Sequence, residues 1–468
     1  MEGQGNPCLS SVLKYMDPNL RLRLISRAPQ LRPFSTSAPL HLNHLEFEPL
    51  QTTINSTTYK LSIFKEWHPG RTEYGPNVTI DQDLDEYGFT MDAENLVKTA
   101  GDVDLRDSKA LRYPKVFQDL ERNSEAVEAE LEKRVRFNEN LLSMKLGKKK
   151  QETDFVEMFE NAMDISKEPG TSAPNNQVNL PFSKSFLDDN TIELQKRLTT
   201  ARANYLPFQC RRNNLAPPYT AHLQLIITSP SGVQVYRTPY TMKLVEALKK
   251  IHEFFFEKRA PVTVTEMVIS PDVKILRIPA GLKFKPLSLS TPIEALCPFK
   301  TILAKSDYAL NSLTIKNVKP KHLACFYFPA VRRARTLIIA NSFYERDSWR
   351  AVFRAVANRH VVLKNEGNKF NNEDALGLIK DWIDNVDRCH GATMTFGLKK
   401  ESTARKFLTE VGKQWEPVQS SKTCVIVPMK DKKRRLIISY QEVNSNPMEE
   451  NSHESKWILK LKIGKAKK

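Results

Sequence analysis

The sequence lacks long hydrophobic segments. No apolar run approaches the roughly 20 residues that a membrane helix needs; candidates such as Leu223 to Ile227 and Phe254 to Phe256 are far shorter. A hydrophobic share of 40% with 27% charged residues is typical of a soluble globular protein. With 468 residues, the chain is long enough for two to four domains that each bury a core. We therefore expect a soluble multidomain protein with no membrane partner.

Cysteine is scarce and widely spaced. Zinc sites need ligands at short, fixed spacings, and a disulfide scaffold needs many cysteines in a small chain. The sequence has no CxxC pair, and this pattern favours a reducing compartment, the cytoplasm or the nucleus. The six cysteines lie at positions 8, 210, 297, 325, 389 and 424.

Catalytic signatures are also missing. The sequence contains no GxxxxGK[ST], GxGxxG, HExxH or GxSxG motif. Asp81, Asp83 and Asp85 alternate like the start of a calcium loop. Such a loop needs Gly at its sixth position and Glu at its twelfth, where this chain has Glu86 and Asp92. We expect a solvated acidic turn there, and a protein that is not an enzyme and uses no cofactor and no metal.

The charge is strongly positive overall but unevenly distributed. The net charge is +17, with five bases in residues 430–435 and six lysines in residues 456–468. Residues 81–107, in contrast, hold nine acidic and two basic side chains. Such runs are typical of solvated faces and turn tips, so we expect no nucleic-acid partner. A basic nucleic-acid-associated protein remains an alternative, because the two basic runs could contact phosphates.

The pattern of apolar residues changes several times along the chain. Residues 38–80 alternate in short runs, which predicts strands, and residues 120–142 recur at three- and four-residue steps, which predicts a long amphipathic helix. Residues 188–203 predict another helix, and HLQLIIT and VQVYRTPY, joined by SPSG, predict a β-hairpin. Separate blocks of strands and helices are typical of an α+β fold. The expected divisions are a helical module at 6–34, a β-rich region at 38–115, a long-helix region at 116–166, a Pro/Gly/Asn-rich linker at 167–183, an α+β domain at 184–290 and a repeat-like α/β domain at 291–468 with C-terminal strands and a basic tail.

The last third of the chain has a repeating rhythm. Strand-like runs recur at 313–315, 336–339, 360–363 and 393–396, with helix-like stretches between the later ones. A strand and a helix that recur every 20 to 30 residues are typical of a leucine-rich-repeat-like solenoid. On the helix NEDALGLIKDWIDN we expect Trp382 to pack in the core of that solenoid.

The stretch PCLSSVLKYMDPNLRLRLISRAPQLRPFSTSAPL, residues 7–40, could be an import peptide or a docking module. Its arginines and Ser/Thr run suit an import peptide. Pro18, however, divides it into two short helices whose apolar faces need a partner. The periodicity therefore favours a docking module.

This docking module resembles a degenerate F-box. Pro7, the pair Val12-Leu13, the run Tyr15-Met16-Asp17, Leu20-Arg21 and Leu24 match the F-box pattern in order, whereas Asn6 replaces a leucine and Ala28-Pro29 replaces a tryptophan.

The rest of the chain is similar to the nematode F-box C proteins. TYKLSIF, DLDEYGF, AGDVDLR, YLPFQCRRNNLAPPYTAHLQLIIT, TPYTMKLVEALKKI and LRIPAGLKFK occur here in the order of that family, with its domain of unknown function. NEDALGLIKDWIDN resembles the F-box-associated region of the same family. The resemblance implies an α+β multidomain protein: an N-terminal F-box-like helical module, an α+β centre with a long helix, and a C-terminal leucine-rich-repeat-like α/β region.

The resemblance also implies a function. In F-box proteins the N-terminal helices bind a Skp-family adapter, and the C-terminal domain captures a protein for ubiquitination. We expect a non-enzymatic substrate receptor of a Skp–cullin–F-box ubiquitin ligase whose protein substrate is unknown. A scaffold protein with a vestigial F-box is the other alternative. The expected adapter-binding residues are Pro7, Val12, Leu13, Met16, Leu20 and Leu24.

Overall fold

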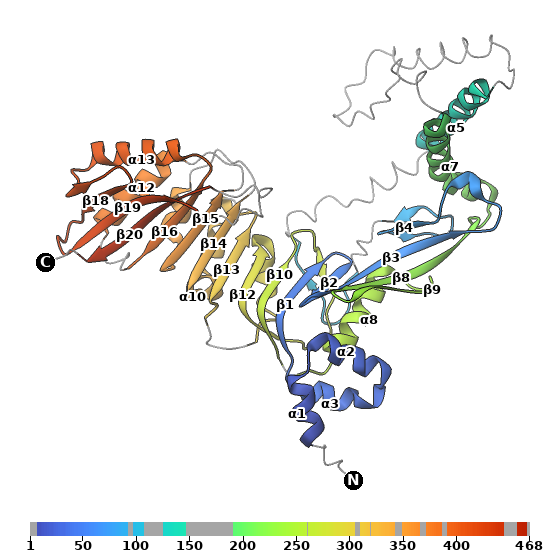
Figure 1. Cartoon of the computed structure of the whole chain (residues 1–468), viewed down its shortest axis with the longest axis horizontal. Coiled ribbons are helices and arrows are strands. Elements are labelled where there is room, and N and C mark those ends of the chain that lie inside the picture. The colour runs from blue at the N-terminus through green and yellow to red at the C-terminus, as the bar shows by residue number, and fades with distance from the viewer. Residues whose placement is uncertain are drawn as a thin grey trace.

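One extended sheet runs along most of the length of the molecule (Figure 1). The computed structural model describes residues 7–91, 97–106, 125–146, 191–259, 261–304, 309–318, 320–341, 349–365, 371–385, 391–443 and 456–465. Within these residues, sixteen strands join into the sheet in the order β17-β18-β19-β20-β16-β15-β14-β13-β12-β10-β1-β2-β3-β8-β9, with β4 paired to β3. None of the described helices is both long and apolar enough to cross a membrane.

The N-terminal half combines a small helical module with an antiparallel part of the sheet. The module contains α1 (Pro7–Tyr15), α2 (Pro18–Arg27), the 3₁₀ turn η1 (Pro29–Leu31) and α3 (Arg32–Ser37). Asp17 ends the first helix and caps the second, because its Oδ1 accepts a hydrogen bond from the Leu20 amide at 2.9 Å. The antiparallel strands are β1 (His41–Glu48), β2 (Gln51–Ile54), β3 (Thr57–Trp67), β4 (Val78–Ile80), β8 (Tyr219–Ser229) and β9 (Gly232–Pro239).

The C-terminal half is built on a parallel ladder. Seven strands from β1 to β16 pair in parallel, each with the next in space. They are β1, β10 (Val262–Ile269), β12 (Phe284–Pro292), β13 (Ser312–Lys316), β14 (Thr336–Asn341), β15 (His360–Asn365) and β16 (Thr393–Leu398). Four antiparallel strands complete this end: β20 (Trp457–Lys465), β19 (Arg434–Glu442), β18 (Cys424–Pro428) and β17 (Gln419–Ser420).

Helices cover one face of this ladder. Leucine, isoleucine and valine alternate with polar residues along the strands, so that one face is buried and the other is not. The buried face packs on apolar residues of the connecting helices, such as Val352, Ile379 and Phe407. The covering segments are α9 (Leu296–Phe299), η7 (Pro320–Tyr327), α10 (Pro329–Arg333), α11 (Arg350–Ala355), α12 (Asn372–Asp384) and α13 (Glu401–Gln414), and α8 (Leu244–Phe256) packs on the N-terminal half.

Two long helices project from the far end of the antiparallel strands (Figure 1). They are α5 (Glu125–Lys145) and α7 (Thr191–Asn213). The expected helix at 188–203 continues ten residues further, through Pro207. It continues because Tyr205 and Phe208 are buried in a small core with Val135 of α5, and this packing outweighs the hydrogen bond that proline cannot donate.

Most of the expected helices and strands are present, and two of them are shorter than the sequence predicts. The hairpin of β8 and β9, the four strand-like runs of the last third and the buried Trp382 are confirmed. The apolar pattern of VKILRIP, residues 273–279, predicts a strand, but the segment contains only the two-residue strand β11 (Ile275–Leu276), which pairs with β7 (Val103–Asp104) outside the large sheet. The pattern of DSWRAVFRAVANR, residues 347–359, predicts a helix, of which α11 forms only Arg350–Ala355. The linker at 167–183 lies outside the described residues.

Candidate interaction surfaces

A buried arginine organises the N-terminal module. The Arg21 side chain is 1% exposed, and its guanidinium donates hydrogen bonds to the carbonyls of Leu13 (3.2 Å), Ala38 (2.7 Å) and Pro39 (2.8 Å). It also donates to the hydroxyl of Ser35 at 2.9 Å and to the Ser35 carbonyl. Burial lowers the pKa of Arg21 below its ordinary value. Because one side chain joins α1, α3 and the chain leading into β1, the module has a fixed shape.

A second arginine fastens the module to the rest of the molecule. Arg259, just beyond α8, donates to the Ser35 carbonyl at 2.6 Å and to its hydroxyl at 3.2 Å. Burial, followed by the charges of Arg21 and Arg32, lowers the pKa of Arg259 to about 10. Arg32 in turn lies 3.4 Å from the Glu257 carboxylate. Residues 224 positions apart in the chain are thus held together.

The structure divides the six expected adapter-binding residues between the surface and the interior. Val12 is 56% exposed and Leu20 is 52% exposed, whereas Leu13 is completely buried and packs inside the protein. Met16 and Leu24 are half-buried. Pro7 begins α1, and its side chain lies outside the described residues.

The exposed apolar residues of the module include one that the prediction left out. Tyr15 is 82% exposed and lies three residues after Val12, on the same side of α1. The spacing of three residues was the signal that could have identified it. We call Val12, Tyr15 and Leu20 the exposed apolar set of the module.

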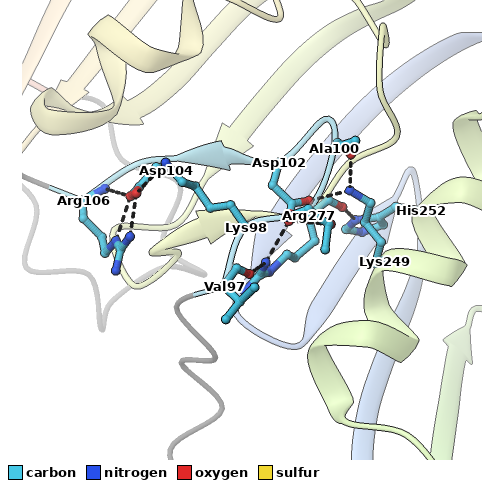
Figure 2. A network of polar contacts seen from close by, with 10 residues as sticks. Val97, Lys98, Ala100, Asp102, Asp104, Arg106, Lys249, His252 and Arg277 are labelled. Carbon is cyan, nitrogen blue, oxygen red and sulfur yellow. Dashed lines mark hydrogen bonds and ion pairs between the residues drawn. The ribbon is translucent and has the colours of Figure 1, made fainter. Parts of the chain in front are cut away.

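A buried ionic network holds the loop at 97–106 against the core (Figure 2). The Asp102 carboxylate, whose side chain is fully buried, lies 2.6 Å from Lys249 Nζ and 2.8 Å from Arg277 Nη1. Burial acts to raise the pKa of Asp102, but hydrogen bonds from Lys249, Thr99 and Arg277 outweigh it and the pKa is lowered. Both cations also donate to loop carbonyls, those of Ala100 and Val97. All of these donors and acceptors are satisfied within the protein, so the network is structural.

A glycine lets the loop at 97–106 pack closely against the backbone of residues 278–280. Gly101 has φ of +91°, and an added Cβ would lie 2.4 Å from the Ala280 nitrogen and 2.6 Å from the Ile278 oxygen. A side chain there would collide with the backbone. The contact therefore requires glycine.

His252 lies beside the network and is neutral. Its Nδ1 donates to the Arg277 carbonyl, and its Nε2 accepts from the Thr52 hydroxyl at 2.6 Å. Burial lowers the pKa of His252 to about 4. The ring therefore serves as a neutral bridge between α8 and β2.

The alternating acids of DQDLDEYGF, Asp81, Asp83 and Asp85, each have a structural role. Asp81 pairs with Lys60 at 2.7 Å. Asp83 is buried and accepts from the Tyr240 hydroxyl and from the Leu244 amide at the start of α8, both at 2.8 Å. Asp85 accepts from the amides of the turn that follows it. The three carboxylates thus point to different partners, and no group of His, Cys, Asp or Glu among the described residues could hold a metal ion.

The uncovered face of the sheet at the C-terminal end carries charge of one sign. Lys364, His360, Lys460 and Lys462 are exposed, and their strand neighbours at Val361, Leu363, Leu459 and Leu461 are buried on the helix side. At β1 and β10 the same side of the sheet instead presents acids: His44 lies 3.1 Å from Glu266 and 3.5 Å from Glu46. The uncovered face therefore carries acids at β1 and β10, whereas its positions on β15 and β20 carry bases and no acid.

Comparison with known proteins identifies a single region. A family described as a domain of unknown function, DUF3557, matches residues 243–400. This region runs from the start of α8 through the parallel strands β10 to β16. No curated protein and no solved structure matches the chain.

Proposed function

We propose that this chain is a non-enzymatic substrate receptor of a Skp–cullin–F-box ubiquitin ligase, of the nematode F-box C type, acting in the cytoplasm or nucleus. In this proposal α1 to α3 form the F-box-like module that binds a Skp-family adapter. The parallel strands with their helices form a leucine-rich-repeat-like region that captures a protein substrate. The observation that carries the proposal is the exposed apolar set of a three-helix module, which matches the F-box pattern in sequence.

The attachment of the module supports this role. A receptor must hold its substrate at a defined position relative to the adapter, which requires a stiff connection. Here Ser35 receives hydrogen bonds from Arg21 within the module and from Arg259 of the neighbouring domain. Leu22 and Ile25 of α2 belong to the same continuous core as the parallel strands. An adapter on the exposed apolar set would thus be held rigidly relative to the sheet.

Capture of recombinant Skp-family adapters by the purified full-length chain tests the proposal. Leu20→Asp should abolish capture or reduce it by about tenfold or more, because a charge would be buried in an apolar contact. Leu215→Asp is the matched control, since Leu215 is 61% exposed at the end of the projecting helix α7, far from the module. Capture by the wild type and this control, with loss for Leu20→Asp, supports the proposal.

Two outcomes would overturn the receptor function. If the folded wild type captures no adapter, the module is vestigial and the chain is a scaffold. If Leu20→Asp binds as well as the wild type, the adapter contacts another surface. Leu13→Asp is unsuitable for this test, because Leu13 is completely buried and the change would disrupt the module itself.

A nucleic-acid-associated protein is the second candidate function. Its support is the basic turn between β18 and β19, in which Lys432 and Lys433 are exposed. Two of the five bases there are engaged: Lys430 lies 2.7 Å from Asp384, and Arg434 lies 2.8 Å from Asp431. This function predicts an affinity for duplex DNA that falls steeply with salt, because phosphate contacts release counterions. Weak binding that does not depend on salt would exclude it.

A further inference from the structure

The uncovered face of the C-terminal strands has an unusual composition. Its positions on β13, β14, β15, β16, β20 and β19 can be followed across the sheet by strand register. None of these positions holds Asp or Glu. We call this surface the basic open face, and its basic residues are Lys316, His360, Lys364, Lys460, Lys462 and Arg435.

Three bases of the basic open face flank two threonines. In one row of the sheet, Thr393 lies between His360 and Lys462. In the next row, Thr395 lies between Val362 and Lys460. Neighbouring strands are about 4.8 Å apart, so the flanking side chains of a row start about 10 Å from each other and can reach a common group.

These basic residues have no acidic partner among the described residues. On the helix side of the same domain, two arginines are paired: Arg354 lies 2.7 Å from Asp381, and Arg405 lies 2.7 Å from Glu401. No described carboxylate pairs with Lys364, Lys460 or Lys462. The basic open face therefore carries positive charge that no described acid on the same face balances.

The basic open face suits an acidic polypeptide better than a nucleic acid. Proteins that bind single strands stack bases on aromatic side chains and arginine, but the positions of this face hold no Phe, Tyr or Trp and one arginine. They offer hydroxyls that can donate to carboxylates, and aliphatic side chains such as Ile338 and Val362 that can pack against a peptide. Lysine and threonine around an aliphatic floor complement a segment in which Asp or Glu alternates with small apolar residues.

We infer that the basic open face binds an acidic segment of another protein, with carboxylates seated over Thr393 and Thr395 between His360, Lys460 and Lys462. This inference rests on the proposed function only in calling that protein a substrate. The binding itself needs no adapter. From β13 to β20 the face spans about 19 Å, which an extended segment of about six residues crosses.

Fluorescence anisotropy with the full-length chain tests the inference. The probe is a labelled peptide of about 12 residues in which Glu alternates with Ala, long enough to cross the face at about 3.3 Å per residue. The double variant Lys460→Glu/Lys462→Glu should weaken binding by about tenfold or more, because the β20 flank of both rows becomes repulsive to carboxylates. A probe with Gln in place of Glu should not bind.

The matched control reverses the same number of charges on the other side of the same sheet. Lys406 and Lys413 are exposed on α13, and Lys406→Glu/Lys413→Glu changes the net charge equally. This control should bind the Glu probe like the wild type. Thr395→Val, which removes one hydroxyl and keeps the shape, should weaken binding by a smaller factor of about two to five.

Several results would overturn the inference. They are a wild type that does not bind the Glu probe at low salt, equal losses in both double variants, and tighter binding of a single-stranded DNA of similar charge. Self-association of the wild type that disappears in Lys460→Glu/Lys462→Glu would assign the face to a second copy, whose Glu46 and Glu266 supply the acids. Adapter capture is measured separately, so failure of the receptor proposal would leave this result unaffected.

Discussion

The two halves of the sheet are held together by different kinds of polar contact. In the N-terminal half, buried polar side chains join residues far apart in the chain: His252 to Thr52 over 200 positions, Lys249 to Asp102 over 147 and Arg259 to Ser35 over 224. In the C-terminal half, comparable contacts are local. Asn358 donates to the carbonyl of Val331, 27 positions earlier, and Trp349 donates to Asp374, 25 positions later.

The difference follows from how far apart in the sequence the packed segments of each half lie. Successive strand–helix units of the parallel ladder bury apolar residues against the previous unit, so each closes only a short loop. The antiparallel half must join α1 to α3, the loop at 97–106 and α8 without any repeat. Specific polar pairs fix those positions, because a buried charge tolerates only the arrangement that satisfies it.

The largest expected effect is the loss of Asp102. Asp102→Asn keeps the shape of the side chain and removes its charge, which leaves Lys249 and Arg277 buried beside each other without a counterion. We expect the free energy of unfolding to fall by about 3 to 5 kcal/mol, the usual cost of removing one partner of a buried pair. Urea denaturation at pH 7 measures it. Because the pKa of Asp102 is lowered, its contribution is present at neutral pH and is lost as the pH falls below about 3.8.

The matched control for Asp102 lies two residues away (Figure 2). Asp104 pairs with Arg106 at 2.6 Å, and hydrogen bonds from Arg106 lower the pKa of Asp104 to about 2. The Asp104 side chain is 22% exposed whereas that of Asp102 is fully buried, and the loss of Asp104 leaves one largely buried cation, Arg106, without this partner instead of two. Asp104→Asn should therefore cost much less than Asp102→Asn. Equal costs would mean that the buried network does not hold the N-terminal half together.

The next effect concerns pH. His252 has a pKa of about 4 in the folded protein, against about 6.5 when unfolded, so the unfolded chain binds more protons between these values. Stability should therefore decrease as the pH falls from 6.5, by about 3 kcal/mol when pH 4 is reached. His252→Gln should show a shallower slope in urea denaturation between pH 6.5 and 5. Parallel slopes for the two proteins would contradict the neutral, buried ring.

The sequence revealed the repeating half better than the irregular one. The strand-like runs at 313–315, 336–339, 360–363 and 393–396 all became strands, because a buried ladder needs apolar residues at regular positions and periodicity displays them directly. The long-range polar pairs produce no such periodic pattern in the sequence. Nothing in the local pattern around Asp102 or His252 indicates which residue 147 or 200 positions away will contact it.

The candidate surfaces were predictable to different degrees. Helical spacing placed Val12 and Leu20 among exposed apolar residues, but it also selected Leu13, which faces the interior. The nine-residue helix α1 has apolar side chains on two sides, and only its packing against Arg21 and α3 decides which side is covered. The basic open face could not be predicted from the sequence, because its six bases come from four separate strands, one or two from each. Only strand register brings them together.

The smallest expected effect lies in the C-terminal half. Arg354 of α11 donates to both oxygens of Asp381 on α12, at 2.7 Å and 2.9 Å, but its side chain is 53% exposed. Hydrogen bonds from Arg354 lower the pKa of Asp381, yet water already solvates the arginine and a second arginine, Arg350, lies 3.6 Å from the same carboxylate. Arg354→Ala should therefore leave urea denaturation unchanged within error, at low and at high salt, because exposed ion pairs contribute little. A loss comparable to that of Asp102→Asn would show that the repeating half, too, depends on specific ion pairs rather than on its apolar ladder.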